Sequence, residues 1–368
     1  MPKTPPFRAD HIGSLVRPQR LVEARRAFLA GKMKKEPLRE LEDIAIRDVV
    51  RMQEDLGLQA VTDGEFRRNS YLSEFLNPLG VELQHGKSTD MLYYDDAGGT
   101  APGTLAVVKA KLRWTGSPNV AAFTYLKLVT KAMPKVTIPA PTQVHMFAGR
   151  DGISKTAYPD EDSFWADMVA AYHAELKVLG EAGCRYVQID ETSMPKLADP
   201  AIQDVVAKRG QDWRAVLKTY ADVMNRIIAG APAGMTVAIH HCRGNNAGRW
   251  IAQAGYDAVA EMLFGAVNAK LYLLEYDTPR AGDFAPLRFV PKGKIVVLGL
   301  VTSKRGALES KDELKRRIDE ASRHLPLEQL ALSPQCGFAS GERGNRLSAD
   351  EQWAKLRLVV DVAREVWG

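Results

Sequence analysis

The chain has 368 residues, of which 45% are hydrophobic, so it can bury a large core as one α/β barrel or as two ordinary domains. Its 50 basic and 45 acidic side chains leave a net charge of +5 without a concentrated basic block, which argues against a dedicated nucleic-acid-binding protein. Three scattered cysteines exclude a disulfide scaffold, and no apolar run suits a signal peptide or a membrane span. We therefore expect a cytoplasmic protein.

Eight short, apolar, β-rich runs recur along the chain, and most follow an amphipathic helical segment. The first such segment has apolar residues at three- and four-residue intervals from Leu38 to Leu56, with Gly57 where a left-handed cap is expected. This alternation is typical of a parallel sheet, and eight strands close a TIM barrel. We predict strands at residues 9–14, 58–65, 135–142, 184–191, 235–242, 270–277, 294–301 and 330–337. The fold class expected is an α/β TIM (β/α)8 barrel, formed by a single catalytic domain over residues 1–368.

A long segment between the second and third predicted strands interrupts the alternation of helices and strands. Within it, residues 91–103 suit a glycine-rich loop, residues 105–116 alternate like a hairpin strand, and residues 120–133 suit a helix. We predict an insertion at roughly residues 80–132, with a flap over the mouth of the barrel as one role. Its apolar residues Leu92, Tyr93 and Tyr94 fit either a packed lid or a contact in a homo-oligomer.

Polar side chains gather where the predicted strands end. In TIM-barrel enzymes the active site lies at the C-terminal ends of the strands. Carboxylates and thiols are expensive to bury there unless a partner such as a metal offsets their desolvation. The residues at these ends are His11, Ser14, Asp63, Glu65, Gln188, Asp190, Glu191, His240, His241, Cys242, Glu275, Asp277, Thr302, Ser303 and Cys336.

A metal site is the chemistry that best explains part of this set. His240 and Cys242 lie at i and i+2 of one strand, so their side chains share a face. Glu275 at the next strand end and Cys336 at the last join them if the barrel closes. Histidine, cysteine and carboxylate are donors that zinc prefers. A buried cysteine is otherwise usually a packing residue, the role that we assign to Cys184 at the start of its strand.

The motifs at these positions resemble those of a known family. "HIGSLVRP", "DGEFRRNSYLSEF", "QIDE", "HHC", "LLEYD" and "SPQCGF" occur in the order found in the C-terminal catalytic barrel of cobalamin-independent methionine synthase, and especially in its short, single-barrel relatives. The resemblance implies a catalytic Zn²⁺ held by His240, Cys242, Glu275 and Cys336. It also implies a homocysteine site built from Ile12, Ser14, Glu65 and Asp190, to which we add His11 as a further substrate-binding candidate. Glu65 and Asp190 are also the predicted catalytic residues.

The elements that serve the folate substrate in this family differ in this sequence. Full-length methionine synthase carries a second, N-terminal barrel that helps to bind the polyglutamyl folate, whereas the resemblance here covers one barrel. The family's "HSPR"-type element, whose histidine is regarded as the proton donor, reads "TSKR" with Thr302 at the histidine position. A threonine hydroxyl is a poor general acid at neutral pH. The methyl donor is left open among methyltetrahydrofolate, a methylcobalamin protein and a small methylated compound.

Three functions remain in competition. The first is a zinc-dependent methyltransferase that acts on the thiol of homocysteine or a close analogue. The second is an alkyltransferase of another thiol, similar to epoxyalkane:coenzyme M transferase, but Glu65 and Asp190 favour an amino-acid thiol over a sulfonate, which requires cations. The third is a non-catalytic zinc- or homocysteine-binding protein. It remains an alternative because Thr302 stands where the family has the histidine that is regarded as the proton donor.

Overall fold

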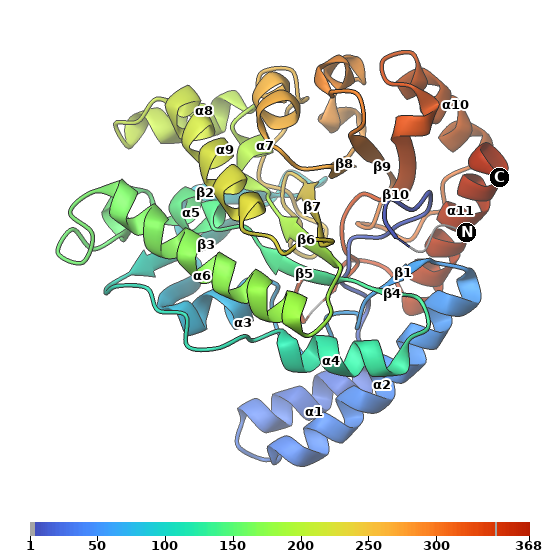
Figure 1. Cartoon of the computed structure of the whole chain (residues 1–368), viewed down its shortest axis with the longest axis horizontal. Coiled ribbons are helices and arrows are strands. Elements are labelled where there is room, and N and C mark those ends of the chain that lie inside the picture. The colour runs from blue at the N-terminus through green and yellow to red at the C-terminus, as the bar shows by residue number, and fades with distance from the viewer. Residues whose placement is uncertain (1–3, 343) are drawn as a thin grey trace.

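A curved parallel sheet forms the centre of the fold in the computed structural model, which describes residues 4–342 and 344–368 (Figure 1). Six strands pair in parallel in the order β10-β9-β8-β7-β6-β5, and two more, β1 and β4, pair separately in parallel. The strands are β1 (Ala60–Val61), β4 (Met133–Pro134), β5 (Val136–Pro139), β6 (Tyr186–Asp190), β7 (Thr236–His241), β8 (Leu271–Glu275), β9 (Ile295–Val301) and β10 (Leu330–Pro334). Seven of the eight predicted runs therefore contain a strand of this barrel.

The ring closes through short connections at the N-terminal segment. On one side, β4 leads directly into β5 and so joins β1 to the large sheet. On the other side, Ala9 forms a parallel bridge with Leu332 of β10. The Thr62 hydroxyl, just after β1, donates to the Gly13 carbonyl at 2.6 Å. The α/β barrel class predicted from the sequence is confirmed.

The first predicted strand, residues 9–14, forms no regular strand beyond that bridge. Asp10 anchors this segment inside the barrel, because its carboxylate accepts from the Tyr186 hydroxyl at 2.5 Å and from the Lys135 ammonium at 3.0 Å. Gly13 then adopts a φ of +138°, which turns the chain away from extended geometry. The segment therefore reaches the end of the barrel as an irregular loop.

Helices surround the strands (Figure 1). Helix α2 ends before Gly57, whose φ of 90° confirms the predicted cap. The helices are α1 (Gln19–Leu29), α2 (Lys35–Leu56), α3 (Ser73–Leu76), α4 (Val120–Val129), α5 (Thr142–Ala148), α6 (Glu161–Glu181), α7 (Ser193–Lys196), α8 (Pro200–Lys208), α9 (Trp213–Ala229), α10 (Lys311–Ser322) and α11 (Ala349–Trp367). Among the described residues, none of these helices combines the length and apolar character that a membrane span needs.

Side chains along the strands alternate between two hydrophobic clusters. One cluster fills the barrel and includes Ile12, Tyr186, Ala238, Leu273, Val297 and Ala331. The other lies between strands and helices and includes Val187, Ile239, Tyr272 and Leu298. Because successive strand residues face opposite sides, Asp190, His240 and Glu275 continue the inward-facing series at the C-terminal ends.

The segment between β1 and β4 forms an antiparallel hairpin followed by α4. The hairpin strands are β2 (Val81–Tyr94) and β3 (Thr100–Val108), so the prediction of a loop over residues 91–103 is wrong except near residues 95–99. The hairpin contacts the loop that follows β7, because Tyr94 and Trp250 exchange backbone hydrogen bonds of 2.7 and 3.1 Å. The hairpin is therefore tied to the strand-end face of the barrel.

Candidate active site

Three predicted metal ligands meet at this face. His240 and Cys242 come from the end of β7, and Cys336 follows β10. One potential ligand atom from each side chain lies within 4.8 Å of the other two, and the two sulfur atoms are 4.0 Å apart. All three residues are buried. The structure thus brings together the predicted histidine ligand and both predicted cysteine ligands. Cys184 lies in the core.

The His240 ring is oriented for a metal. Its Nδ1 lies 3.1 Å from the Leu273 carbonyl oxygen, so Nδ1 carries the proton and donates it. Its Nε2 is buried without a hydrogen-bond partner among the described residues. A metal-binding histidine typically donates its other ring N–H to a carbonyl or carboxylate, which fixes the tautomer. An unpartnered Nε2 beside two thiols fits zinc.

The two cysteines interact directly through their sulfur atoms. The thiol of Cys336 donates to the sulfur of Cys242, and this hydrogen bond, together with the nearby His240 ring, holds the pKa of Cys242 well below its usual range despite burial. The same hydrogen bond and burial raise the pKa of Cys336. One of the two sulfur atoms therefore carries negative charge readily, as a soft cation site requires.

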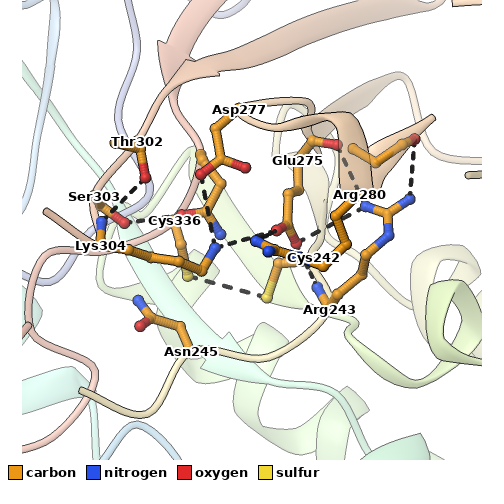
Figure 2. Close-up of polar contacts among 12 residues, drawn as sticks. Cys242, Arg243, Asn245, Glu275, Asp277, Arg280, Thr302, Ser303, Lys304 and Cys336 are labelled. Carbon is orange, nitrogen blue, oxygen red and sulfur yellow. Dashed lines mark hydrogen bonds and ion pairs between the residues drawn. The ribbon is translucent and has the colours of Figure 1, made fainter. Parts of the chain in front are cut away.

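Glu275, the fourth predicted ligand, lies outside this cluster (Figure 2). Its Oε2 accepts the backbone N–H of Arg243 at 2.6 Å, and its Oε1 lies 3.1 Å from the Lys304 ammonium. Burial would raise its pKa, but the charges of Lys304, Arg243 and Arg280 outweigh burial and lower it to about 2. In this structure the carboxylate faces these cations, and Glu275 as the fourth metal ligand stays a prediction.

A cavity with about 410 Å³ of space not filled by atoms opens beside the sulfur atoms. Four of the five predicted substrate residues line it, namely Ile12, Ser14, Glu65 and Asp190. The other lining residues are Tyr71, Thr192, His240, Cys242, Gly244, Asn245, Cys336, Gly337 and Ser340. Tyr71 belongs to one of the family motifs, whereas nothing in the sequence pattern marked Asn245, whose amide donates to the Gly337 carbonyl at 2.9 Å.

Glu65 is held in a strained and crowded position. It has a φ of 61°, which a residue with a side chain rarely adopts, and such strain is typical of functional sites. Its Oε1 accepts from the Thr137 hydroxyl at 2.8 Å, while the buried Oε2 has no hydrogen-bond partner in the described part of the chain. A Cβ on Gly13 would lie 3.1 Å from Oε1 and 2.7 Å from Thr137 Cγ2, so glycine is needed beside this carboxylate.

Asp190 is the second carboxylate of the cavity. Burial, reinforced by the nearby Glu65 charge, raises its pKa to about 7, although the opposing effects of His240 and of a hydrogen bond from Gln188 limit the rise. The Gln188 amide donates to Oδ1 at 2.6 Å. Two carboxylates that disfavour each other's charge in one cavity create a site that a cation stabilises.

His11, the remaining predicted substrate residue, does not line the cavity. It is buried beneath the site, where its neighbours include Gln53, Ala60 and Lys135. Its pKa falls from 6.5 to about 4, first because of burial and then because of the Lys135 charge. Asp10 and Ile12 face the interior of the barrel, so His11 between them faces the other way, toward Gln53 of α2.

This placement predicts an acid-dependent stability. Between pH 6.5 and 4 the unfolded chain protonates His11 while the folded chain does not, so the stabilisation present above pH 6.5 is lost as the pH falls to about 4. We expect the free energy of unfolding to fall by about 3 kcal/mol more in the wild type than in His11→Gln over this range, measured with urea. Parallel pH profiles, or a large change in substrate KM in the variant, would contradict the buried neutral imidazole.

Comparison with known proteins places the chain in a family. Residues 7–365 match the family described as "Cobalamin-independent synthase, Catalytic domain". The uncharacterized protein YxjH of Bacillus subtilis (strain 168) is 42% identical over 364 residues, which cover 98% of this chain and 95% of that protein. Methionine synthase of Pyrococcus abyssi is 25% identical over 328 residues, which cover 89% of this chain and 85% of that protein.

A solved structure agrees with these matches. The putative vitamin-B12 independent methionine synthase of Listeria monocytogenes superimposes with a TM-score of 0.77 and 33% sequence identity, and the match covers 100% of both chains. The family match spans nearly the whole chain, and five of the six sequence motifs that carried the resemblance contribute residues that line the cavity. The chain therefore belongs to the catalytic-domain family of the cobalamin-independent synthases and is an enzyme of the methionine synthase type.

Proposed function

We propose that the protein is a zinc-dependent methyltransferase that transfers a methyl group to the thiol of homocysteine or a close analogue. The observation that supports this most directly is the cluster of His240, Cys242 and Cys336 at the wall of a cavity that also contains Glu65 and Asp190. One wall suits a metal-bound sulfur, and the other suits an ammonium group. Homocysteine carries both groups.

The metal site belongs to His240, Cys242 and Cys336, which supply one imidazole nitrogen and two sulfur atoms. This donor set suits zinc better than hard cations such as magnesium or calcium, which prefer oxygen. Bound there, zinc would keep the substrate thiol in its nucleophilic thiolate form at neutral pH. The hydrogen bond from His240 Nδ1–H to the Leu273 carbonyl fixes the orientation of the ring, so Nε2 is the nitrogen that would bind the metal.

The two carboxylates of the cavity bind the amino-acid end of the substrate. The unpartnered Oε2 of Glu65 and the carboxylate of Asp190 accept hydrogen bonds from the ammonium group, and its charge relieves the repulsion between them. The Ser14 hydroxyl, which also lines the cavity, donates to the substrate carboxylate. These contacts fix the amino acid with its sulfur toward Cys242 and Cys336, so the thiolate is positioned for attack on a methyl group.

In the transfer itself, the sulfur lone pair forms the new bond to the methyl carbon while the bond between methyl and donor breaks and leaves its electrons on the donor. The family relationship makes methyltetrahydrofolate the first donor to test, with a methylcobalamin protein and a small methylated compound as the others. Thr302 offers no acid for the departing group, because its hydroxyl accepts from the Lys304 N–H at 3.3 Å and does not line the cavity.

The cavity disfavours the coenzyme M alternative. Among the described residues, no lysine or arginine lines it, whereas a sulfonate requires cationic partners. Two carboxylates in the same space would repel that anion. The paired carboxylates also support a substrate site over a non-catalytic zinc site, which is usually closed by four protein ligands.

The test is a methyl-transfer assay on zinc-loaded protein. L-Homocysteine and coenzyme M are each supplied with 5-methyltetrahydrofolate, its triglutamate or methylcobalamin, and the methylated thiol is measured. We expect methionine from at least one donor and no methylated coenzyme M. Bound zinc with no methionine from any donor would refute the proposal, and methylation of coenzyme M alone would favour the alternative.

A further inference from the structure

Lys196, the last residue of α7, is a buried lysine without an ion-pair partner among the described residues, and it is only 1% exposed. The other buried lysines in this part of the chain each pair with a carboxylate at 2.9–3.1 Å, namely Lys135 with Asp10, Lys304 with Glu275 and Lys355 with Glu309. The Lys196 ammonium instead donates to the Thr192 hydroxyl at 3.0 Å. Because burying an unpaired charge is costly, such a group is typical of functional sites.

The surroundings of this ammonium are largely apolar. Its nitrogen lies 5.3 Å from the centre of the Phe147 ring. Burial lowers the pKa of the ammonium below its usual value, and the charges that oppose this shift are those of Cys242, Glu191 and Glu275. The Glu191 carboxylate accepts from two backbone N–H groups of α7 at 2.9 and 3.1 Å. Lys196 therefore releases its proton more readily than a lysine on the surface.

Thr192 connects Lys196 to the cavity beside the sulfur atoms. It lies two residues after the end of β6, and it is one of the residues that line this cavity. Because its oxygen accepts from Lys196, its own O–H points elsewhere, and that proton has no acceptor among the described residues. The hydroxyl can therefore donate to a molecule in the cavity while it receives a proton from Lys196.

The other titratable groups of the cavity have different roles in the proposed function. The imidazole and the two sulfur atoms are assigned to the metal, and the two carboxylates to the substrate ammonium. Tyr71 donates its hydroxyl to Gln143 at 2.7 Å, and burial holds its pKa well above its usual range. Thr302 replaces the histidine that is regarded as the family's proton donor. Lys196 is thus the remaining source of a proton for the methyl donor.

We propose that Lys196, acting through Thr192, supplies the proton that a nitrogen-bound methyl donor such as 5-methyltetrahydrofolate needs as its methyl group leaves. The inference rests on the proposed function. As the homocysteine thiolate bonds to the methyl carbon, the carbon–nitrogen bond breaks and its electrons stay on nitrogen. That nitrogen takes the Thr192 hydroxyl proton, and Thr192 takes one from Lys196. The products are a thioether and two neutral amines. The proton released by the next thiol balances the loss, so a turnover needs no other acid.

Two donors with different leaving groups test the inference on zinc-loaded protein. Tetrahydrofolate leaves with a proton on nitrogen, whereas methylcobalamin leaves as cob(I)alamin, which needs none. In Lys196→Met we expect kcat with 5-methyltetrahydrofolate to fall on the order of 10²-fold, and kcat with methylcobalamin to fall at least about tenfold less. Zinc content and the KM for homocysteine should change little. Lys355→Met is the matched control, because it removes a buried lysine whose partners Ala307 and Glu309 do not line the cavity. Any loss there should be equal for both donors.

Thr192→Val and Thr192→Ser form a second test. Valine keeps the shape of the side chain without the hydroxyl, whereas serine keeps the hydroxyl, so with 5-methyltetrahydrofolate the serine variant should be on the order of tenfold faster. If Lys196→Met does not fold, this pair decides. No loss in Lys196→Met, equal losses with both donors, or a wild type that uses methylcobalamin alone would overturn the inference and leave the proposed function standing. A wild type that forms no methionine from any donor would refute both.

Discussion

Replacing Cys242 by serine should remove most zinc binding and, with it, methyl transfer. The zinc binding free energy of four-ligand sites is about 10–16 kcal/mol, so one ligand contributes roughly 3 kcal/mol, or on the order of 10²-fold in affinity. A serine hydroxyl stays protonated at neutral pH and replaces a thiolate poorly. In this protein the loss should be at least that large, because Cys242 is the thiol whose pKa lies well below the usual range. Chelator competition and methionine formation measure the two losses.

Cys184→Ser is the matched control for this substitution. Cys184 is also buried, but it lies two residues before β6, where its thiol donates to the Tyr186 carbonyl at 3.5 Å and burial raises its pKa to about 12. A thiol of this kind stays protonated, so the control should bind zinc as the wild type does. Full zinc retention in Cys242→Ser, or a similar loss in Cys184→Ser, would show that the metal lies elsewhere.

The metal cluster could be predicted because two regular features of the sequence coincide there. His240 and Cys242 have the i, i+2 spacing that places two side chains on one face of a strand. Strand β10 ends at Pro334, two residues before Cys336, and the ends of parallel strands meet at one face of a barrel. Strand alternation and closure of the barrel therefore determine this part of the site without any loop geometry.

The position of Glu275 could not be predicted in the same way. Its place at the end of β8 is regular, but Lys304 and Arg243 lie in loops, where the sequence gives no rule for side-chain direction. Whether a carboxylate turns to a metal or to an ammonium depends on the distances and burial of both, which sequence spacing does not contain.

The hairpin shows a third limit of prediction from the pattern. Glycines at residues 98, 99 and 103 indicated a loop, yet β3 runs from Thr100 to Val108. A Cβ on Gly103 would lie 2.1 Å from the Met91 carbonyl oxygen, so this glycine permits close approach of β2 and β3. Gly103 therefore lies between closely paired strands and not in a turn. The sequence does not show the partner strand, which is what distinguishes the two cases.

Glu65→Gln should weaken homocysteine binding while zinc stays in place. The change removes the negative charge whose Oε2 is proposed to accept from the substrate ammonium, and it keeps the size of the side chain and an acceptor for Thr137. A hydrogen bond to a charged group contributes about 1.5–3 kcal/mol, so we expect KM or Kd for homocysteine to rise roughly 10- to 150-fold. Calorimetric titration and metal analysis on the same samples measure both quantities.

A substrate without the amino group separates recognition from general damage. 4-Mercaptobutanoate has the thiol and carboxylate of homocysteine but no ammonium, so it should bind the wild type weakly and lose little further in Glu65→Gln. If Glu65 instead only shapes the cavity, both thiols should lose affinity by the same factor. A larger loss of affinity for homocysteine than for 4-mercaptobutanoate would therefore show that Glu65 binds the substrate ammonium. It would also identify the substrate as an amino-acid thiol.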